Sequence, residues 1–145
     1  MAKLQVELVT AEGRVLSEEA DFVKLPGLGG ELGVLPEHIP LLTPLRTGEV
    51  MVRNEGRDQF LFVAGGFVEV LPDRVVILAD VAERAEDIDE AAAEEARRAA
   101  QEALAQDAGD ADAAAELERS IFRLRVADIR RGHRRDRRGD QPPPE

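Results

Sequence analysis

The feature that most constrains the fold is an abrupt change in composition near residue 86. Before it, short apolar stretches alternate with Gly, Pro, Asn and Asp, which is the pattern of strands joined by tight turns. After it, Ala, Glu, Arg and Gln predominate and β-branched residues become rare, which favours helices. The sequence therefore predicts an α+β fold, with a β domain over residues 1–85, a helical domain over residues 86–132 and a disordered tail over residues 133–145.

The first part contains one clear strand signal and two hairpin signals. Leu4, Val6 and Leu8 alternate with polar residues, as in a strand with one buried face. Residues 49–63 and residues 67–78 each hold two apolar runs around a turn, and Gly65-Gly66 separates the two hairpins. Many short strands with frequent turns predict a β-sandwich or a flattened barrel.

The second part predicts two helices joined by a short turn. Asp87 with Glu90 three residues later favours a helix start, and the helix is expected to run to about Gln106. Asp107-Ala108-Gly109-Asp110 interrupts it. A second helix is expected from about Asp112 to Arg131, with Gly132 as its stop.

Apolar stripes on the two helices predict an αα-hairpin. The first stripe consists of alanines at helical spacing, namely Ala92, Ala96, Ala99 and Ala103. The second consists of Leu117, Ile121 and Leu124. Alanine side chains bury little apolar area, and each buried methylene contributes only about 0.8 kcal/mol. The hairpin should therefore be easy to open.

The charge distribution bears on possible partners. The formal net charge is −11, which argues against general binding to nucleic acid. Arginines are nevertheless concentrated near the C-terminus, at positions 119, 123, 125, 130, 131, 134, 135, 137 and 138. Only Phe122 could supply a stacking platform there, which also disfavours single-strand binding. Two interpretations stay open: a solvated basic helix face, or docking onto an acidic protein surface.

Composition also excludes several kinds of site. Cysteine is absent, so disulfides and thiolate metal sites are impossible, and the two histidines are too far apart in sequence to predict a metal site. No apolar run approaches the roughly 20 residues that cross a bilayer, so membrane association is expected only through a partner.

A catalytic site is only weakly indicated. Glu31, Glu37 and His38 could divide acid and base roles, but Pro36 and Pro40 place His38 in a stiff loop, where a packing or interface role is the simpler interpretation. Gly27-Leu28-Gly29-Gly30 lacks the Lys and Ser/Thr of a phosphate loop. Alternative hypotheses are a hydrolase using Glu37 and His38, and a free-standing protein-binding adapter.

Three segments carry a resemblance to a known family. They are Gly30-Glu31-Leu32-Gly33-Val34-Leu35-Pro36-Glu37-His38-Ile39-Pro40-Leu41-Leu42-Thr43, then Val63-Ala64-Gly65-Gly66-Phe67-Val68-Glu69-Val70, and Val76-Ile77-Leu78-Ala79-Asp80-Val81-Ala82-Glu83-Arg84. In this order, ahead of a helical hairpin, they closely resemble the epsilon subunit of bacterial F-type ATP synthases.

The resemblance implies both a fold and a function. The fold is an N-terminal ten-stranded β-sandwich followed by a C-terminal antiparallel two-helix hairpin. The function is that of a non-catalytic rotor subunit, on the central stalk between the gamma subunit and the c-ring, which couples rotation to ATP synthesis. Glu31 and the loop through His38 are implied to face the c-ring or gamma. The complex would hold the chain peripherally at the cytoplasmic side of the cell membrane.

The resemblance also implies a regulatory role for the helices. They can extend along gamma toward the alpha and beta catalytic subunits and restrain ATP hydrolysis, with Arg119, Arg123 and Arg125 as the candidate contacts. Some members bind ATP through Ile or Leu, Asp, two variable residues, Arg and Ala. Here Ile88 and Asp89 match this motif, but Ala92 replaces the arginine. Weak ATP binding, and no bound cofactor, are therefore expected.

Overall fold

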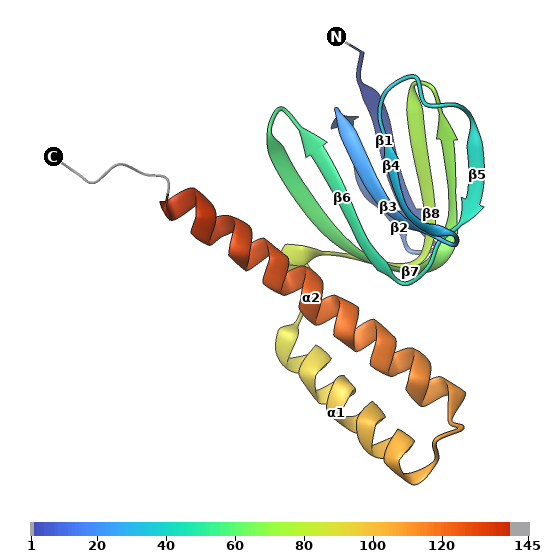
Figure 1. Cartoon of the computed structure of the whole chain (residues 1–145), viewed down its shortest axis with the longest axis vertical. Helices are drawn as coiled ribbons and strands as arrows, with labels where there is room; N and C mark the ends of the chain where they lie inside the picture. Colours follow the sequence, from blue (N-terminus) through green and yellow to red (C-terminus); the bar gives the residue numbers. More distant parts are fainter. Residues whose placement is uncertain (1, 140–145) are drawn as a thin grey trace, which may run out of the picture. The chain divides into compact units, whose positions relative to one another are not determined.

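The computed structural model of this 145-residue chain describes residues 2–139, with side chains described through residue 132. The chain divides into two compact units, one spanning Met1–Asp87 and the other Ile88–Glu145. The first unit holds every strand and the second holds the two α-helices of the described residues (Figure 1).

The first unit is a β-sandwich whose eight strands belong to one hydrogen-bonded sheet. The strand order is β2-β1-β8-β7-β6-β3-β4, and β5 pairs with β7 off this path. The pairs are antiparallel except β1 with β8, which run parallel. The strand bounds are β1 (Leu4–Thr10), β2 (Gly13–Ala20), β3 (Phe22–Gly27), β4 (Gly30–Val34), β5 (Leu41–Pro44), β6 (Gly48–Asn54), β7 (Arg57–Leu71) and β8 (Arg74–Arg84).

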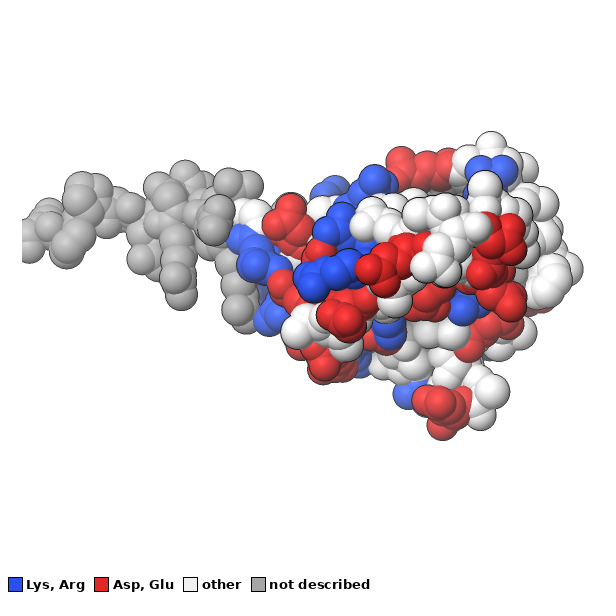
Figure 2. Space-filling model, turned by 90° about the horizontal axis from the view of Figure 1, so that it is seen from below, with Lys and Arg blue, Asp and Glu red and all other residues white. Residues whose placement is uncertain are grey.

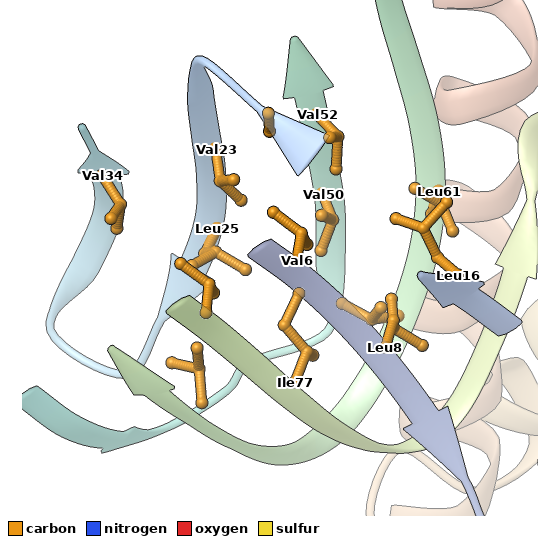
Figure 3. Packing of buried hydrophobic residues seen from close by; sticks show 14 of the residues in the cluster. Val6, Leu8, Leu16, Val23, Leu25, Val34, Val50, Val52, Leu61 and Ile77 are labelled. Atoms are coloured by element: carbon orange, nitrogen blue, oxygen red, sulfur yellow. The ribbon is translucent and has the colours of Figure 1, made fainter. Parts of the chain in front are cut away.

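The sandwich is held together by alternating apolar side chains that meet in one core. The predicted pattern of β1 is confirmed, since Leu4, Val6 and Leu8 are fully buried while Gln5 and Glu7 are not. Figure 3 shows side chains from different strands pointing toward one another. The core residues that it labels are Val6, Leu8, Leu16, Val23, Leu25, Val34, Val50, Val52, Leu61 and Ile77.

The described residues form eight strands and not the ten that the resemblance implied. The two expected hairpins are merged, because β7 continues through Gly65 and Gly66 as one strand of 15 residues. Its first half pairs with β6 and its second half with β5. Both glycines have a positive φ, of 69° and 109°, so the strand bends there without ending. One bent strand thus serves where two were expected.

The second unit begins after a short 3-10 turn, Ala85–Asp87, and contains α1 (Glu90–Gln106) and α2 (Ala111–Gly139). Helix α1 is capped by Asp89, whereas the sequence predicted a cap by Asp87. The backbone of Asp89 is extended, and its carboxylate accepts a hydrogen bond of 3.0 Å from the N–H of Ala92. Asp87 lies inside the 3-10 turn, where it cannot take the extended conformation of a cap.

The turn between the helices is organised by two aspartates. Asp107 Oδ1 accepts from the N–H of Gly109 and Asp110 Oδ1 accepts from the N–H of Ala113, each at 3.0 Å. Asp110 thereby caps α2, as Asp89 caps α1. The helices run antiparallel from this turn, as Figure 1 shows.

The buried stripes of the helices differ from the predicted ones. On α1, Ala93 and Ala100 are buried, while Ala92 and Ala99 are exposed. Alanine occupies both sets of positions, so the alanine pattern is compatible with two adjacent stripes. On α2 the buried residues include Ala113 and Ser120, whereas Ile121, expected in the stripe, is 40% exposed.

Helix α2 does not stop at Gly132. It continues to Gly139, so residues 133–139 are helical and the prediction of disorder is wrong for them. An interior glycine costs only about 1 kcal/mol relative to alanine, and the following arginines are good helix formers. Residues 140–145, the rest of the predicted tail, lie outside the described residues.

Candidate functional site

Glu31 occupies the second position of β4, where it takes part in an ion-pair row across three strands. Lys24 of β3 lies between β4 and β6, and its Nζ is 3.1 Å from Glu31 Oε1 and 3.1 Å from Glu49 Oε1. The Glu31 side chain is 66% exposed, while that of Glu49 is 15% exposed. Glu31 is therefore held in place but remains accessible to a partner.

The two carboxylates change the ionisation of Lys24. Partial burial opposes its charged form, but the hydrogen bonds with Glu31 and Glu49 outweigh this effect, and the pKa of Lys24 is raised above its ordinary value. The lysine therefore stays protonated at neutral pH. The row across β4, β3 and β6 carries one positive and two negative charges, so it is net acidic.

His38 lies in the loop that joins β4 to β5. Its ring Nδ1 is 2.6 Å from the carbonyl oxygen of Ile39, and its backbone N–H donates to the carbonyl of Leu35 at 3.2 Å. The loop is tied to the turn between β7 and β8, because the N–H of Glu37 donates to the carbonyl of Pro72 at 2.7 Å. The imidazole is thus engaged with its own loop, and Glu37 adopts a positive φ of 70°.

The structure does not bring Glu31 and His38 together. Glu31 is near the beginning of β4 and His38 follows its end, so about 10 Å of strand separates Glu31 from Val34, at roughly 3.3 Å per residue. The two residues therefore mark the two ends of one edge strand, and they do not form a single constellation.

The loop and β5 display apolar side chains that the sequence did not single out. Ile39 is 76% exposed and Leu42 is 68% exposed, and Leu35 is also largely exposed. Beside them lies a shallow groove of about 310 Å³ lined by residues of β5 and β7. Exposed apolar groups of this size in one segment are typical of a protein interface. The prolines in this loop were a sequence signal that its side chains stay outside the sheet, because proline cannot donate a hydrogen bond to a neighbouring strand.

A second apolar surface lies on the outer face of β7 and β8. Phe67 and Leu78 are paired across these strands, and they are 54% and 55% exposed. Their neighbours Val68 and Ile77 point into the core, so Phe67 and Leu78 point away from it. The alternation of side chains along a strand places Phe67 and Val68 on opposite faces of the sheet. It does not indicate which face meets a partner.

The second unit contains a groove between the open ends of α1 and α2. Its volume is about 540 Å³, and the residues that line it are Glu94, Arg97, Ile121, Leu124, Arg125, Asp128 and Arg131. Arg97 is paired with Glu94 on the same helix, and Arg131 is paired with Glu90 across the two helices. The groove is therefore lined by both signs of charge, with a small apolar floor.

The three arginines predicted as inhibitory contacts do not share one face of α2. Arg119 and Arg123 are four residues apart and lie on one side, whereas Arg125 lines the groove. Arg119 is 4.0 Å from Glu116, and the guanidinium of Arg125 lies 4.8 Å from the centre of the Phe122 ring. On the face that Figure 2 shows, basic and acidic side chains are interleaved.

The positions of the nucleotide-binding motif are engaged in other ways. The carboxylate of Asp89 is the cap of α1. Ala92, which replaces the motif arginine, is exposed on the first turn and offers no hydrogen-bond donor from its side chain. The carboxylate of Asp89 therefore has a structural role that does not depend on a bound nucleotide.

The described residues offer neither a cluster for a metal ion nor a helix that could span a membrane. Among the described side chains, no group of three or more His, Cys, Asp or Glu residues is close enough to hold a metal ion. Neither α1 nor the described part of α2 combines the length and the apolar character needed to span a bilayer.

Comparison with known proteins decides the family. Residues 3–85 match the profile of the ATP synthase delta/epsilon chain beta-sandwich domain, and residues 86–128 match that of its long alpha-helix domain. The chain belongs to the ATP synthase epsilon chain family. It is 49% identical over 137 residues to the ATP synthase epsilon chain of Dehalococcoides mccartyi, which covers 92% of this chain and 98% of that protein.

Other relatives agree with this assignment. ATP synthase epsilon chain 2 of Ralstonia nicotianae is 50% identical over 141 residues, covering 94% of this chain and all of the relative. A chain of the Euglena gracilis mitochondrial ATP synthase, in a structure of its OSCP, F1 and c-ring, superposes with a TM-score of 0.67 at 23% identity. That match covers 92% of this chain and 82% of the other, and it supports the fold.

The family assignment confirms the resemblance noted in the sequence. The chain is an epsilon-type, non-catalytic rotor subunit, a stalk component and not the subunit in which ATP is made. The hypotheses of a hydrolase and of a free-standing adapter have no comparable support.

Proposed function

We propose that this epsilon chain couples rotation of the c-ring to ATP synthesis by seating its β-sandwich on the c-ring and on gamma. The observation that carries this proposal is the exposed apolar surface of the β4–β5 loop and β5, where Leu35, Ile39 and Leu42 are held outward by a loop anchored to Pro72. A rigid loop loses little conformational entropy on docking, so its apolar side chains can hold a partner tightly enough to transmit torque.

Glu31 and His38 supply the polar part of the same interface. Glu31 is presented by Lys24 at one end of β4, and His38 by its own loop beyond the other end. An acidic group at one point and an imidazole at another fix the orientation of the sandwich on its partner more than they add affinity. Through these contacts the complex holds the chain at the cytoplasmic side of the cell membrane.

Replacing Glu31 with Gln and His38 with Ala should impair coupling and not chemistry. The double variant is expected to lower proton-driven ATP synthesis by membrane vesicles about two- to tenfold, since losing a few interface contacts costs about 0.5–1.5 kcal/mol. ATP hydrolysis by the detached soluble complex should change little. Glu12→Gln, at an exposed carboxylate in the β1–β2 turn, is the matched control. A collapse of soluble ATPase turnover would count against a coupling role.

The helical hairpin is proposed to restrain ATP hydrolysis. Its buried positions are small side chains, and Arg119 and Arg125 are exposed on different sides of α2. An extended α2 would present these to an acidic surface of the alpha and beta subunits. Several contacts must act together, because each exposed ion pair contributes only about 0–1 kcal/mol.

ATP binding by the isolated chain is expected to be weak. Ala92 cannot make the charge-assisted contact with phosphate, which is typically worth about 1.5–3 kcal/mol, or roughly a tenfold to a hundredfold change in affinity. Calorimetry with Mg-ATP should show little heat at micromolar protein, and Ala92→Arg should tighten binding. Ala99→Arg, at another exposed alanine of α1, controls for added charge. A micromolar dissociation constant for the unmodified chain would refute this expectation.

A further inference from the structure

The two ends of the helical hairpin are held together by different means. At the turn, the chain is continuous and Asp107 and Asp110 organise the backbone through hydrogen bonds of 3.0 Å. At the open end, Glu90 in the first turn of α1 forms an ion pair with Arg131 of α2. The hairpin is thus hinged at one end and joined by opposite charges at the other.

Apart from this pair, the side chains buried near the open end are small, and they include Val126 and Ala127 of α2. The buried residue of α1 nearest to this end is Ala93, and an alanine buries only a methyl group. The adjacent groove of about 540 Å³ separates the side chains of the two helices from Glu94 to Arg131. Because only small apolar side chains are buried at this end, the ion pair adds to what keeps it closed.

Opening of the hairpin affects the Glu90–Arg131 ion pair differently from the neighbouring ion pairs. Glu94–Arg97, Glu95–Arg98 and Glu116–Arg119 each join residues three apart on one helix. They survive when the helices separate. The Glu90–Arg131 pair must break, and its arginine is then free to bind another carboxylate.

We propose that Glu90 and Arg131 form an electrostatic latch that keeps the hairpin closed and withholds Arg131 from acidic partners. The Glu90 and Arg131 side chains are 43% and 54% exposed, so salt weakens the latch. An acidic surface competes with Glu90 for the same guanidinium, and opening is thereby linked to docking. This last step rests on the proposed inhibitory role, whereas the latch itself is a property of the isolated chain.

The latch is tested by measuring the distance between the open ends of the helices in the full chain. The protein has no cysteine, so Ala91→Cys and Gly132→Cys carry spin labels without background. Both positions are exposed, and a side chain at Gly132 meets nothing within 4 Å. Electron double resonance then gives the populations of short and long distances, which report the closed and the open hairpin.

At low salt, Glu90→Gln and Arg131→Gln should each raise the ratio of open to closed hairpin by about 1.5- to fivefold. Because the two residues act as one unit, the double substitution should raise it no further than either single one. Added salt should open the unsubstituted chain and leave the variants nearly unchanged. Glu95→Gln has the same charge change on the same helix, but its pair lies within α1, so it should have no effect.

Three results would overturn the latch: unchanged distances in both single variants, fully additive effects in the double variant, or an equal effect of Glu95→Gln. A failure of the inhibitory role would leave these distances as expected, and would be seen instead in the ATP hydrolysis of the assembled complex.

Discussion

Replacing Gly66 with Ala should destabilise the β-sandwich by about 2–5 kcal/mol, which is a large part of the stability of a typical domain. Gly66 has φ of 109°, and an added Cβ would overlap the carbonyl oxygen of Leu78 and lie 2.8 Å from the Cα of Ala79. Both obstacles are backbone atoms of β8, so relief requires the pairing of β7 with β8 to shift.

Two other glycines provide graded controls for this substitution. Gly65 also has a positive φ, but its added Cβ would meet the side chain of Asp80, which can rotate away. Gly56 has φ of 76° and nothing within 4 Å, so only the backbone cost of about 1–2 kcal/mol applies. Denaturant unfolding followed by the amide NMR signals of β7 and β8 should order the losses as Gly66, then Gly65, then Gly56. A loss at Gly66 no larger than at Gly56 would contradict the steric account.

Ending the chain after Asp87 should leave the sandwich folded and assembled while raising ATP hydrolysis by the complex about two- to tenfold. The core residues of the first unit all precede Asp87, so the deletion removes none of them. A tenfold rise would correspond to a bias of about 1.4 kcal/mol toward the restrained state. The measurement is steady-state hydrolysis at matched epsilon content, established by quantifying the chain in the purified complex.

Arginine substitutions test the inhibitory contact while the hairpin stays in the chain, so their effect on hydrolysis can be compared with that of deleting it. Changing Arg119, Arg123 and Arg125 together to Gln should reproduce part of the rise, and increasingly little of it as salt increases. Because Arg125 lies in the groove and on a different side of α2 from the other two, a straight helix can present only one of these sides to a flat surface. Either the pair Arg119 and Arg123, or Arg125 alone, should therefore carry most of the triple effect. The inhibitory role fails if the truncated complex assembles normally and hydrolyses ATP no faster at any salt concentration.

Local sequence determined the larger features of this protein. The change in composition near residue 86 separated strands from helices, because β-branched and helix-favouring residues have opposite backbone preferences. The alternation of Leu4, Val6 and Leu8 predicted which face of β1 is buried. The three matching segments identified the family, since turn glycines and prolines at fixed spacing constrain the backbone over a long stretch.

Tertiary structure decided what depends on long-range pairing and packing. Only the register of β6 and β5 on β7 shows that Gly65 and Gly66 bend one strand where two were expected. The stripe predicted on α1 was wrong at Ala92 and Ala99, because alanines also lie on the neighbouring face and packing buries Ala93 and Ala100 there. The exposure of Phe67 and Leu78 follows from chain topology, as does the pairing of Glu90 with Arg131, which are 41 positions apart in the sequence. Local patterns specify which faces are apolar but not what each face meets.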